Sequence, residues 1–253
     1  MRLIHVLGIA GGAVLLSVTG LAAQQAAHRD TVLTAYEVPP GVPAPRVAAV
    51  ESGVVARSEP RVGTFAAKAA ALVDPRWARR TAVAAGIPLP ALTAYARASV
   101  LAPRECRIGW TTLAGIGWLE SRHGSIGDRV LGDDGRSSSP ILGPALDGEA
   151  YAAVPATRES ARWHGDPTWD HAVGPMQFIP STWRTWHSDG DGDGLADPND
   201  IDDASLAAAN YLCASGDLTS GDTWSRSVLG YNHSSDYVLD VYAAASTYAD
   251  RTN

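Results

Sequence analysis

Apolar positions recur at helical spacing over the second half of the chain, and no stretch of any length alternates in the manner of a β-strand. Asp74-Pro75 has the order of an N-cap followed by a first helical residue, and Gly86 with Pro88 ends this first helix. Further helices are predicted over about 90–100, 108–122, 180–186, 204–213, 223–229 and 236–249. Residues 125–178 are rich in Gly, Pro, Asp and Ser and are predicted to form loops. The expected fold class is mainly α.

The N-terminal residues 1–23 have the character of a targeting segment. Residues 3–23 are almost wholly apolar, and Gly20-Leu21-Ala22 offers the small-x-small pattern of a signal-peptidase site. A stretch of about 20 apolar residues is also long enough to span a bilayer. The segment can therefore be a cleaved signal peptide or a retained membrane anchor. The structural alternative is a buried core helix. Either targeting role places the rest of the chain outside the cytoplasm.

Residues 24–73 are predicted to be a Pro/Ala-rich linker. Residues 38–45 contain too many prolines for a helix or a central strand and should be extended. A compact domain is expected over residues 74–253, where helical periodicity begins.

The composition describes a globular protein and argues against nucleic acid as a partner. The 253 residues are 45% hydrophobic and 19% charged, and the formal net charge is −7 with no basic run. Binding to phosphates relies on clustered Lys and Arg. We expect a monomer that does not bind nucleic acid.

The only two cysteines are Cys106 and Cys213. In an oxidising compartment such a pair is expected to form a disulfide. The alternative is two small buried apolar side chains.

Glu120 is the one charged residue in the run WTTLAGIGWLE at residues 110–120. A helix that is apolar on nearly every face lies in the core, so Glu120 leaves the core at the helix C-terminus. Desolvation and the negative end of the helix dipole should both raise its pKa. A carboxyl group that holds a proton near neutral pH can act as a general acid on a glycosidic oxygen. The structural alternative is a glutamate that caps its helix or pairs with Arg122.

Three further segments give the chain a resemblance to a known family. Glu120-Ser121, then AVGPMQFIPSTW at residues 172–183, then GYNH at 230–233 resemble, in type and order, the signature of the lytic transglycosylases, which have a lysozyme-like fold. The Asp/Gly loop near residue 190 and the cysteine pair are similar to the membrane-bound type B branch, in its actinobacterial form. The resemblance covers roughly residues 74–249 and marks 74–253 as a catalytic domain.

The resemblance implies a reaction and the residues that perform it. Family members cleave the β-1,4 bond between N-acetylmuramic acid and N-acetylglucosamine in peptidoglycan and leave 1,6-anhydro ends. Glu120 would be the single catalytic acid and base. Met176 and Gln177 would line the cleft, and Tyr231 and Asn232 would face Glu120, with Tyr231 orienting its carboxyl group. Ser121 is expected to bond the carboxyl group or the substrate. The alternatives are a loop-fixing amide for Gln177 and core packing for Tyr231.

The run DGDGDGLADPND at residues 189–200 fits a twelve-residue calcium-binding frame. Five carboxylates this close repel one another unless a cation sits among them. The resemblance adds weight, because the type B branch carries one such loop here. The expected ligands of a structural Ca²⁺ are Asp189, Asp191, Asp193, the carbonyl group of Leu195, and Asp200. The alternative is a solvated Asp/Gly turn.

The leading hypothesis is a peptidoglycan lytic transglycosylase, secreted or anchored at the outer face of the membrane. A hydrolytic muramidase of similar fold, a non-catalytic wall-binding module and a calcium-dependent adhesive module are the alternatives. The sequence contains no His-Glu-x-x-His, Cys-x-x-Cys or Gly-x-Ser-x-Gly pattern, so zinc and serine hydrolases lack support. His123, His171 and His233 are expected to be structural. Four tryptophans could stack on sugars or fill the core: Trp163, Trp169, Trp183 and Trp186.

Overall fold

The computed structural model describes residues 42–46, 49–50, 72–149 and 153–252. The apolar segment 3–23 and most of the expected linker lie outside these residues. Within the described part, the chain forms helices and loops with isolated β-bridges but no β-strand. The mainly α prediction is thus confirmed. Among these helices none has both the length and the hydrophobicity needed to cross a membrane.

The helices follow the predicted order closely. They are α3 (Pro75–Ala85), α4 (Leu89–Leu101), α5 (Trp110–Ser121), α6 (Ala161–His164), α7 (Pro180–Trp186), α8 (Ile201–Cys213), α9 (Gly221–Tyr231) and α10 (Ser235–Thr252). The predicted first helix begins as expected, because the Asp74 side chain accepts hydrogen bonds from the backbone N–H groups of Arg76 and Trp77. Gly86 ends α3 with a φ of 71°.

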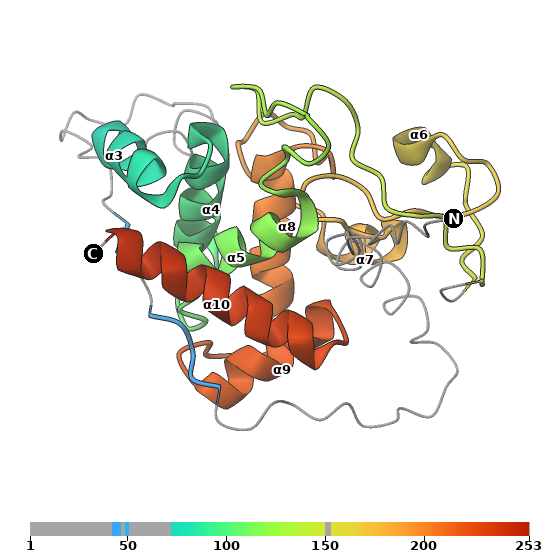
Figure 1. Cartoon of the computed structure of the whole chain (residues 1–253). Helices are drawn as coiled ribbons and strands as arrows, with labels where there is room; N and C mark the ends of the chain where they lie inside the picture. Colours follow the sequence, from blue (N-terminus) through green and yellow to red (C-terminus); the bar gives the residue numbers. More distant parts are fainter. Residues whose placement is uncertain (1–41, 47–48, 51–71, 150–152, 253) are drawn as a thin grey trace, which may run out of the picture.

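Helix α5 is the central element, and it packs against α4, α8 and α10 (Figure 1). Its residues 110–117 are all buried. Two glycines allow close contact with its neighbours. A Cβ atom at Gly115 would lie 2.9 Å from the backbone oxygen of Val241 in α10, and one at Gly117 would lie 2.0 Å from the hydroxyl oxygen of Tyr95 in α4. The core therefore closes around this helix at backbone distance.

The end of α5 differs slightly from the prediction. The helix stops at Ser121, one residue before the predicted end, and the residue that caps it is Arg122, which is left-handed with a φ of 51°. The buried ring of His123 then lies between two tyrosine hydroxyl groups, 3.1 Å from that of Tyr95 and 2.9 Å from that of Tyr248. This network connects the end of α5 to α4 and α10, so His123 has a structural role as expected.

Loops occupy much of residues 125–178, as predicted, with α6 as a short helical interruption. Figure 1 shows α6 and α7 on the same side of the molecule as these loops, beside the group formed by α3–α5 and α8–α10. Isolated bridges join Leu142 to Val173 and Val173 to Phe178. The segment that carries Met176 and Gln177 is thereby held by backbone hydrogen bonds.

Part of the expected linker packs against the domain. Val42, Ala44 and Val50 contact the hydrophobic core, and the backbone oxygen of Arg46 accepts a hydrogen bond from the hydroxyl group of Thr111. A Cβ atom at Gly221 would lie 2.5 Å from the backbone oxygen of Val42, so α9 and this segment meet at their backbones. Residues 42–46 have no helix or strand, but they belong to the domain surface rather than to a free tether.

Cys106 and Cys213 form the predicted disulfide, with their Cα atoms 5.2 Å apart and a sequence separation of 107. The bond joins the segment before α5 to the end of α8. It therefore closes a loop that contains most of the domain.

We predict that replacing both cysteines by Ser lowers the free energy of unfolding by about 2–5 kcal/mol, because the unfolded chain gains the freedom that the crosslink removes. Guanidinium unfolding followed by circular dichroism measures this change. The reduced wild-type protein should lose stability to a similar extent. Equal stability of the variant and the oxidised wild type would contradict the prediction.

Candidate active site

Glu120 lies at the C-terminal end of α5 with only 1% of its surface exposed. Its Oε1 accepts a hydrogen bond of 2.5 Å from the hydroxyl group of Tyr237 in the first turn of α10. Its Oε2 is also buried and accepts no hydrogen bond from any described residue. One oxygen is thus fixed by the protein, and the other is left for a group that the protein does not supply.

Burial raises the pKa of Glu120 from its ordinary value of 4.5 to about 8, and the hydrogen bond from Tyr237 opposes this shift only in part. Both causes act through the immediate surroundings. No carboxylate from the described residues contributes to the shift, including Asp128, Asp133 and Asp134 in the following loop. The Glu120 carboxyl group is therefore protonated near neutral pH and can donate its proton.

Tyr231 was expected to bond the Glu120 carboxyl group, but Tyr237 makes this hydrogen bond. The hydroxyl group of Tyr231 donates a 2.7 Å hydrogen bond to the backbone oxygen of Met176, whereas the hydrogen bond to the Glu120 carboxyl group comes from Tyr237. Burial, together with the nearby charge of Glu120, raises the pKa of both tyrosines well above 10. Both hydroxyl groups therefore keep their protons and act as donors.

Sequence reasoning missed Tyr237 because its only signal was an apolar position in a predicted helix. Tyr231 stood in a recognisable motif, while Tyr237 reads as a core residue of α10. Its side chain does lie in the core, with 6% of its surface exposed, but its hydroxyl group reaches the buried carboxyl group.

The Ser121 hydroxyl group bonds backbone groups and does not bond the Glu120 carboxyl group. Its hydroxyl group donates to the backbone oxygen of Pro175 at 2.7 Å and accepts from the backbone N–H of Gly124 at 2.7 Å. The side chain is fully buried. Ser121 thereby connects the end of α5 to the loop before Met176.

Gln177 and Asn232 are almost completely buried, and each has a carbonyl oxygen without a hydrogen-bond donor among the described residues. The amide nitrogen of Gln177 donates to the backbone oxygen of Gly174 at 2.9 Å, which fixes the side chain, and Gln177 itself has a φ of 50°. Unpaired buried acceptors are costly in a folded protein. Together with Oε2 of Glu120, these oxygens offer acceptors to a ligand rich in O–H and N–H groups.

Met176 is fully buried beside Gln177, and its backbone oxygen is the acceptor for Tyr231. The structure therefore brings the motif around residues 174–177 to the end of α9, next to Asn232. Electrostatic interaction between Tyr231 and Glu120 shows that the third motif also lies close. All three motifs meet around one carboxyl group.

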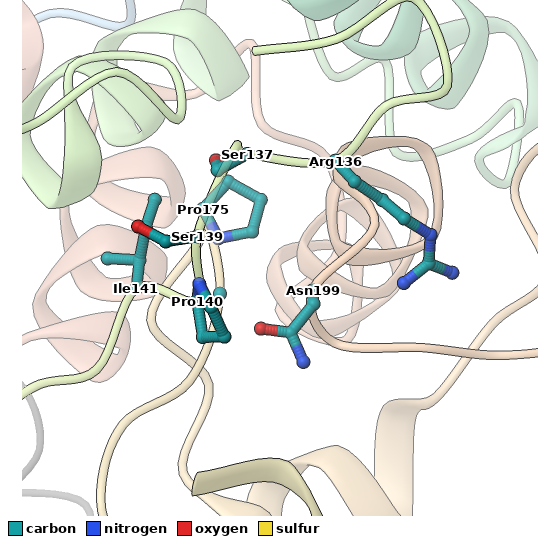
Figure 2. Close-up of a pocket in the computed structure, with 8 residues that line it drawn as sticks. Arg136, Ser137, Ser139, Pro140, Ile141, Pro175 and Asn199 are labelled. Atoms are coloured by element: carbon teal, nitrogen blue, oxygen red, sulfur yellow. The ribbon is translucent and has the colours of Figure 1, made fainter. Parts of the chain in front are cut away.

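A cavity of about 210 Å³ borders the same loop at Gly174 and Pro175. Figure 2 shows the side chains of Pro140 and Pro175 opposite the amide group of Asn199. Arg136, which also lines this cavity, forms ion pairs with Asp197 and Asp200. A Cβ atom at Gly174 would lie 1.7 Å from the backbone oxygen of Pro198, so the loop before Met176 and the acidic loop touch directly.

In the acidic loop, three side chains converge, and one of them differs from the prediction. Carboxylate oxygens of Asp189, Asp191 and Asp203 lie within 4.8 Å of one another. Asp203 comes from α8, and burial raises its pKa to about 7, with the nearby Asp200 and Asp191 adding to the rise. Carboxylate oxygens at this separation are the ligands that a hard divalent cation prefers. The arrangement fits such a cation.

The predicted ligand Asp200 lies outside this cluster. Its side chain caps α8 by accepting from the backbone N–H of Asp202, and it faces Arg136. Asp193 and Leu195 are exposed, and the Asp193 side chain accepts a hydrogen bond from the backbone N–H of Leu195. The twelve-residue frame ends at Asp200, whereas the carboxylate that lies beside Asp189 and Asp191 is that of Asp203, three residues later.

Comparison with known proteins finds similarity over part of the chain. Residues 161–230 match a family model described as the transglycosylase SLT domain. This match includes Gln177 and the acidic loop and excludes Glu120 and Tyr237. No curated protein matches the chain. One similar solved structure is that of the Escherichia coli lytic transglycosylase Slt35 in complex with bulgecin A. It is 17% identical, with a TM-score of 0.46, over 78% of this chain and 82% of that one.

We predict that Glu120→Gln stabilises the folded protein increasingly as the pH rises from about 4.5 to about 8. Because the folded state binds this proton more tightly than the unfolded state, the contribution of Glu120 to wild-type stability is fully present below about pH 4.5 and is lost as the pH rises through this window. The variant has no proton to lose. Its advantage should reach on the order of 2–3 kcal/mol at pH 7 and nearly vanish at pH 4.5.

Urea unfolding at several pH values measures this difference. Asp240→Asn on the exposed face of α10 is the matched control and should show no such trend, because its carboxylate is solvated. A difference between Glu120→Gln and wild type that does not change with pH would contradict a buried, protonated carboxyl group.

Proposed function

We propose that this protein is a peptidoglycan lytic transglycosylase with Glu120 as its general acid and base. The observation that carries the proposal is the buried, protonated carboxyl group of Glu120, held by Tyr237 among unpaired acceptors. The family match over residues 161–230 and the meeting of the three motifs support it. The lysozyme-like fold, the type B branch and an actinobacterial origin belong to the same proposal and rest on the sequence motifs.

In the first step, the Glu120 carboxyl group donates its proton to the oxygen that links N-acetylmuramic acid to N-acetylglucosamine. The bond from C1 to this oxygen breaks, and the electron pair leaves with the oxygen. Because Tyr237 holds Oε1, we assign the proton transfer to Oε2. A pKa near 8 keeps the Glu120 carboxyl group protonated at neutral pH.

In the second step, the Glu120 carboxylate accepts the proton of the C6 hydroxyl group of the muramyl residue as that oxygen attacks C1. The product carries a 1,6-anhydro bridge, and no water is consumed. The buried environment favours reprotonation of the carboxylate, so the same group serves both steps. Gln177 and Asn232 would accept hydrogen bonds from hydroxyl or acetamido groups of the sugars.

The nearest alternative is a hydrolytic muramidase that uses the same Glu120. An ordinary glycosidase uses a second carboxylate, either as a nucleophile about 5–5.5 Å away or as a base further off. No described carboxylate interacts with Glu120. This favours a reaction in which the substrate supplies its own nucleophile.

We also propose that Asp189, Asp191 and Asp203 hold a structural Ca²⁺, which would neutralise their mutual repulsion and fix the start of α8. The ion would take no part in bond cleavage. Its effect on the site would pass through Pro198 and Gly174, whose backbones are in contact.

A substrate in the cell wall requires the domain to lie outside the cytoplasm. We propose that residues 1–23 direct the chain there, as a cleaved signal or as an anchor. The domain would act on glycan strands as a monomer.

We predict that digestion of purified peptidoglycan releases muropeptides with 1,6-anhydro ends, which are lighter by one water than hydrolysed ends. Mass spectrometry of the digest distinguishes the two products. Glu120→Gln should lower the rate by at least about a thousandfold, since both proton transfers depend on this group. Release of hydrolysed ends alone would identify a muramidase, and wall turnover that survives in Glu120→Gln would point to a non-catalytic module.

We predict that Ca²⁺ raises the melting temperature of the wild-type protein and that Asp203→Asn removes this rise. Asp200→Asn is the matched control. It removes the charge that faces Arg136, keeps a side-chain oxygen for the N-cap of α8, and should keep the response to Ca²⁺. Differential scanning calorimetry with and without the metal measures both. A response lost in Asp200→Asn and kept in Asp203→Asn would contradict the assignment, as would a wild type that does not respond.

A further inference from the structure

The outer surface of α3 is basic, although the protein as a whole is acidic. Arg76, Arg79 and Arg80 recur at the spacing of one helix face, and all three are exposed. Trp77 and Ala78, which lie between them in sequence, are buried. Residues 75–101, which include α3 and α4, contain no Asp or Glu, in a chain with a formal net charge of −7. The charge of this surface is therefore opposite to that of the whole molecule.

Two further residues extend this surface toward the C-terminal end of α3. Val83 lies two helical turns after Arg76 on the same face, and it is 85% exposed. Arg251 of α10 is also exposed, and its guanidinium group donates to the backbone oxygen of Ala85. We refer to the whole surface as the basic face, which consists of Arg76, Arg79, Arg80, Val83 and Arg251.

The carboxylates that adjoin the basic face on α3 and α10 already have partners within the protein. Asp74 caps α3 through backbone hydrogen bonds and interacts electrostatically with Arg76 and Arg80. Asp250, in the last turn of α10, forms an ion pair with Arg46. Cationic groups therefore outnumber anionic groups on this surface, and it attracts an anionic partner.

A phospholipid surface fits these side chains better than a soluble polyanion does. The planar guanidinium group of arginine matches the oxygens of a phosphate group, and a helix that lies along a membrane can present several arginines to neighbouring headgroups. Val83 distinguishes the two partners, because a polymer of phosphates or carboxylates offers it no apolar contact. Below the headgroups of a bilayer, the same side chain would be removed from water.

We propose that the basic face docks the domain on a membrane surface that contains anionic phospholipids. Figure 1 shows α3 on the side of the molecule away from α6 and α7. The segment with Met176 and Gln177 directly precedes α7, so docking through α3 turns this part of the candidate active site away from the membrane. For an enzyme with the proposed function, the substrate lies on that side. The docking itself does not depend on the proposed function.

The docking experiment uses the full chain with Val83→Cys, labelled with a nitrobenzoxadiazole dye whose emission depends on its surroundings. The dye reacts at this position because the two native cysteines are joined in the disulfide. Emission is compared on vesicles of phosphatidylcholine alone and of phosphatidylcholine mixed with phosphatidylglycerol. We expect a shift to shorter wavelength on the anionic vesicles only, which high salt reverses by screening. An anchor formed by residues 1–23 would act on both kinds of vesicle, so the difference between them reports on α3.

Two pairs of substitutions in the labelled chain locate the contact. The test pair is Arg76→Gln with Arg79→Gln, and the control pair is Arg158→Gln with Arg162→Gln, which changes the net charge equally at two exposed arginines in and before α6. Each arginine near an anionic surface contributes about fivefold in affinity, so the test pair should weaken docking roughly 25-fold and lose most of the shift. The control pair should keep the shift. Melting temperatures close to that of the wild type show that the variants are folded.

Three results would overturn docking through the basic face. They are an equal shift on both kinds of vesicle, an equal loss of the shift in both pairs, and no shift on the anionic vesicles. If binding to inorganic polyphosphate is weakened by the test pair while the vesicles cause no shift, the partner is a soluble polyanion and the lipid is excluded. Cleavage of soluble glycan strands should be the same in the test pair and the wild type, so a failure of the cleavage assay bears on the proposed function alone.

Discussion

Glu120 keeps its proton near neutral pH because it is buried. Burial of a carboxyl group in turn constrains how the surrounding helices pack. Helix α5 can carry Glu120 into the interior because its other faces are apolar, because Gly115 lets the backbone of α10 approach, and because Gly117 leaves room for the Tyr95 side chain of α4. The hydrogen bond from Tyr237 then offsets part of the desolvation cost without restoring the ordinary pKa. A stronger set of donors would stabilise the charged carboxylate and lower its pKa.

The loops beside the helices fix the segment that carries Met176 and Gln177 relative to Glu120. Ser121 bonds the backbone of Pro175, and Gly174 touches Pro198 of the acidic loop. Arg136 balances Asp197 and Asp200, while Asp189, Asp191 and Asp203 are left facing one another. The acidic loop is thus joined to the segment that carries Met176 and Gln177 by direct contact. A cation in that loop would stabilise the site without touching the substrate.

The buried site around Glu120 also contains polar oxygens that the fold leaves without a donor. Oε2 of Glu120 and the side-chain carbonyl oxygens of Gln177 and Asn232 accept no hydrogen bond from any described residue. In the proposed function, hydroxyl and acetamido groups of a glycan would donate to these oxygens.

The sequence by itself determined the features that depend on neighbours along the chain. Asp74-Pro75 and Gly86 set the limits of α3, and the apolar run before Glu120 predicted a buried, proton-holding carboxyl group, because caps and helical periodicity act over a few residues. Only the tertiary structure decided between Tyr231 and Tyr237, since the answer depends on how α10 packs on α5 after the chain reverses at Asn232. The arrangement of the acidic loop also depends on such packing, because the N-cap of α8 and Arg136 hold the Asp200 side chain while the Asp203 carboxylate lies beside Asp189 and Asp191. Contacts between elements far apart in sequence leave no local pattern, and both arrangements arise from such contacts.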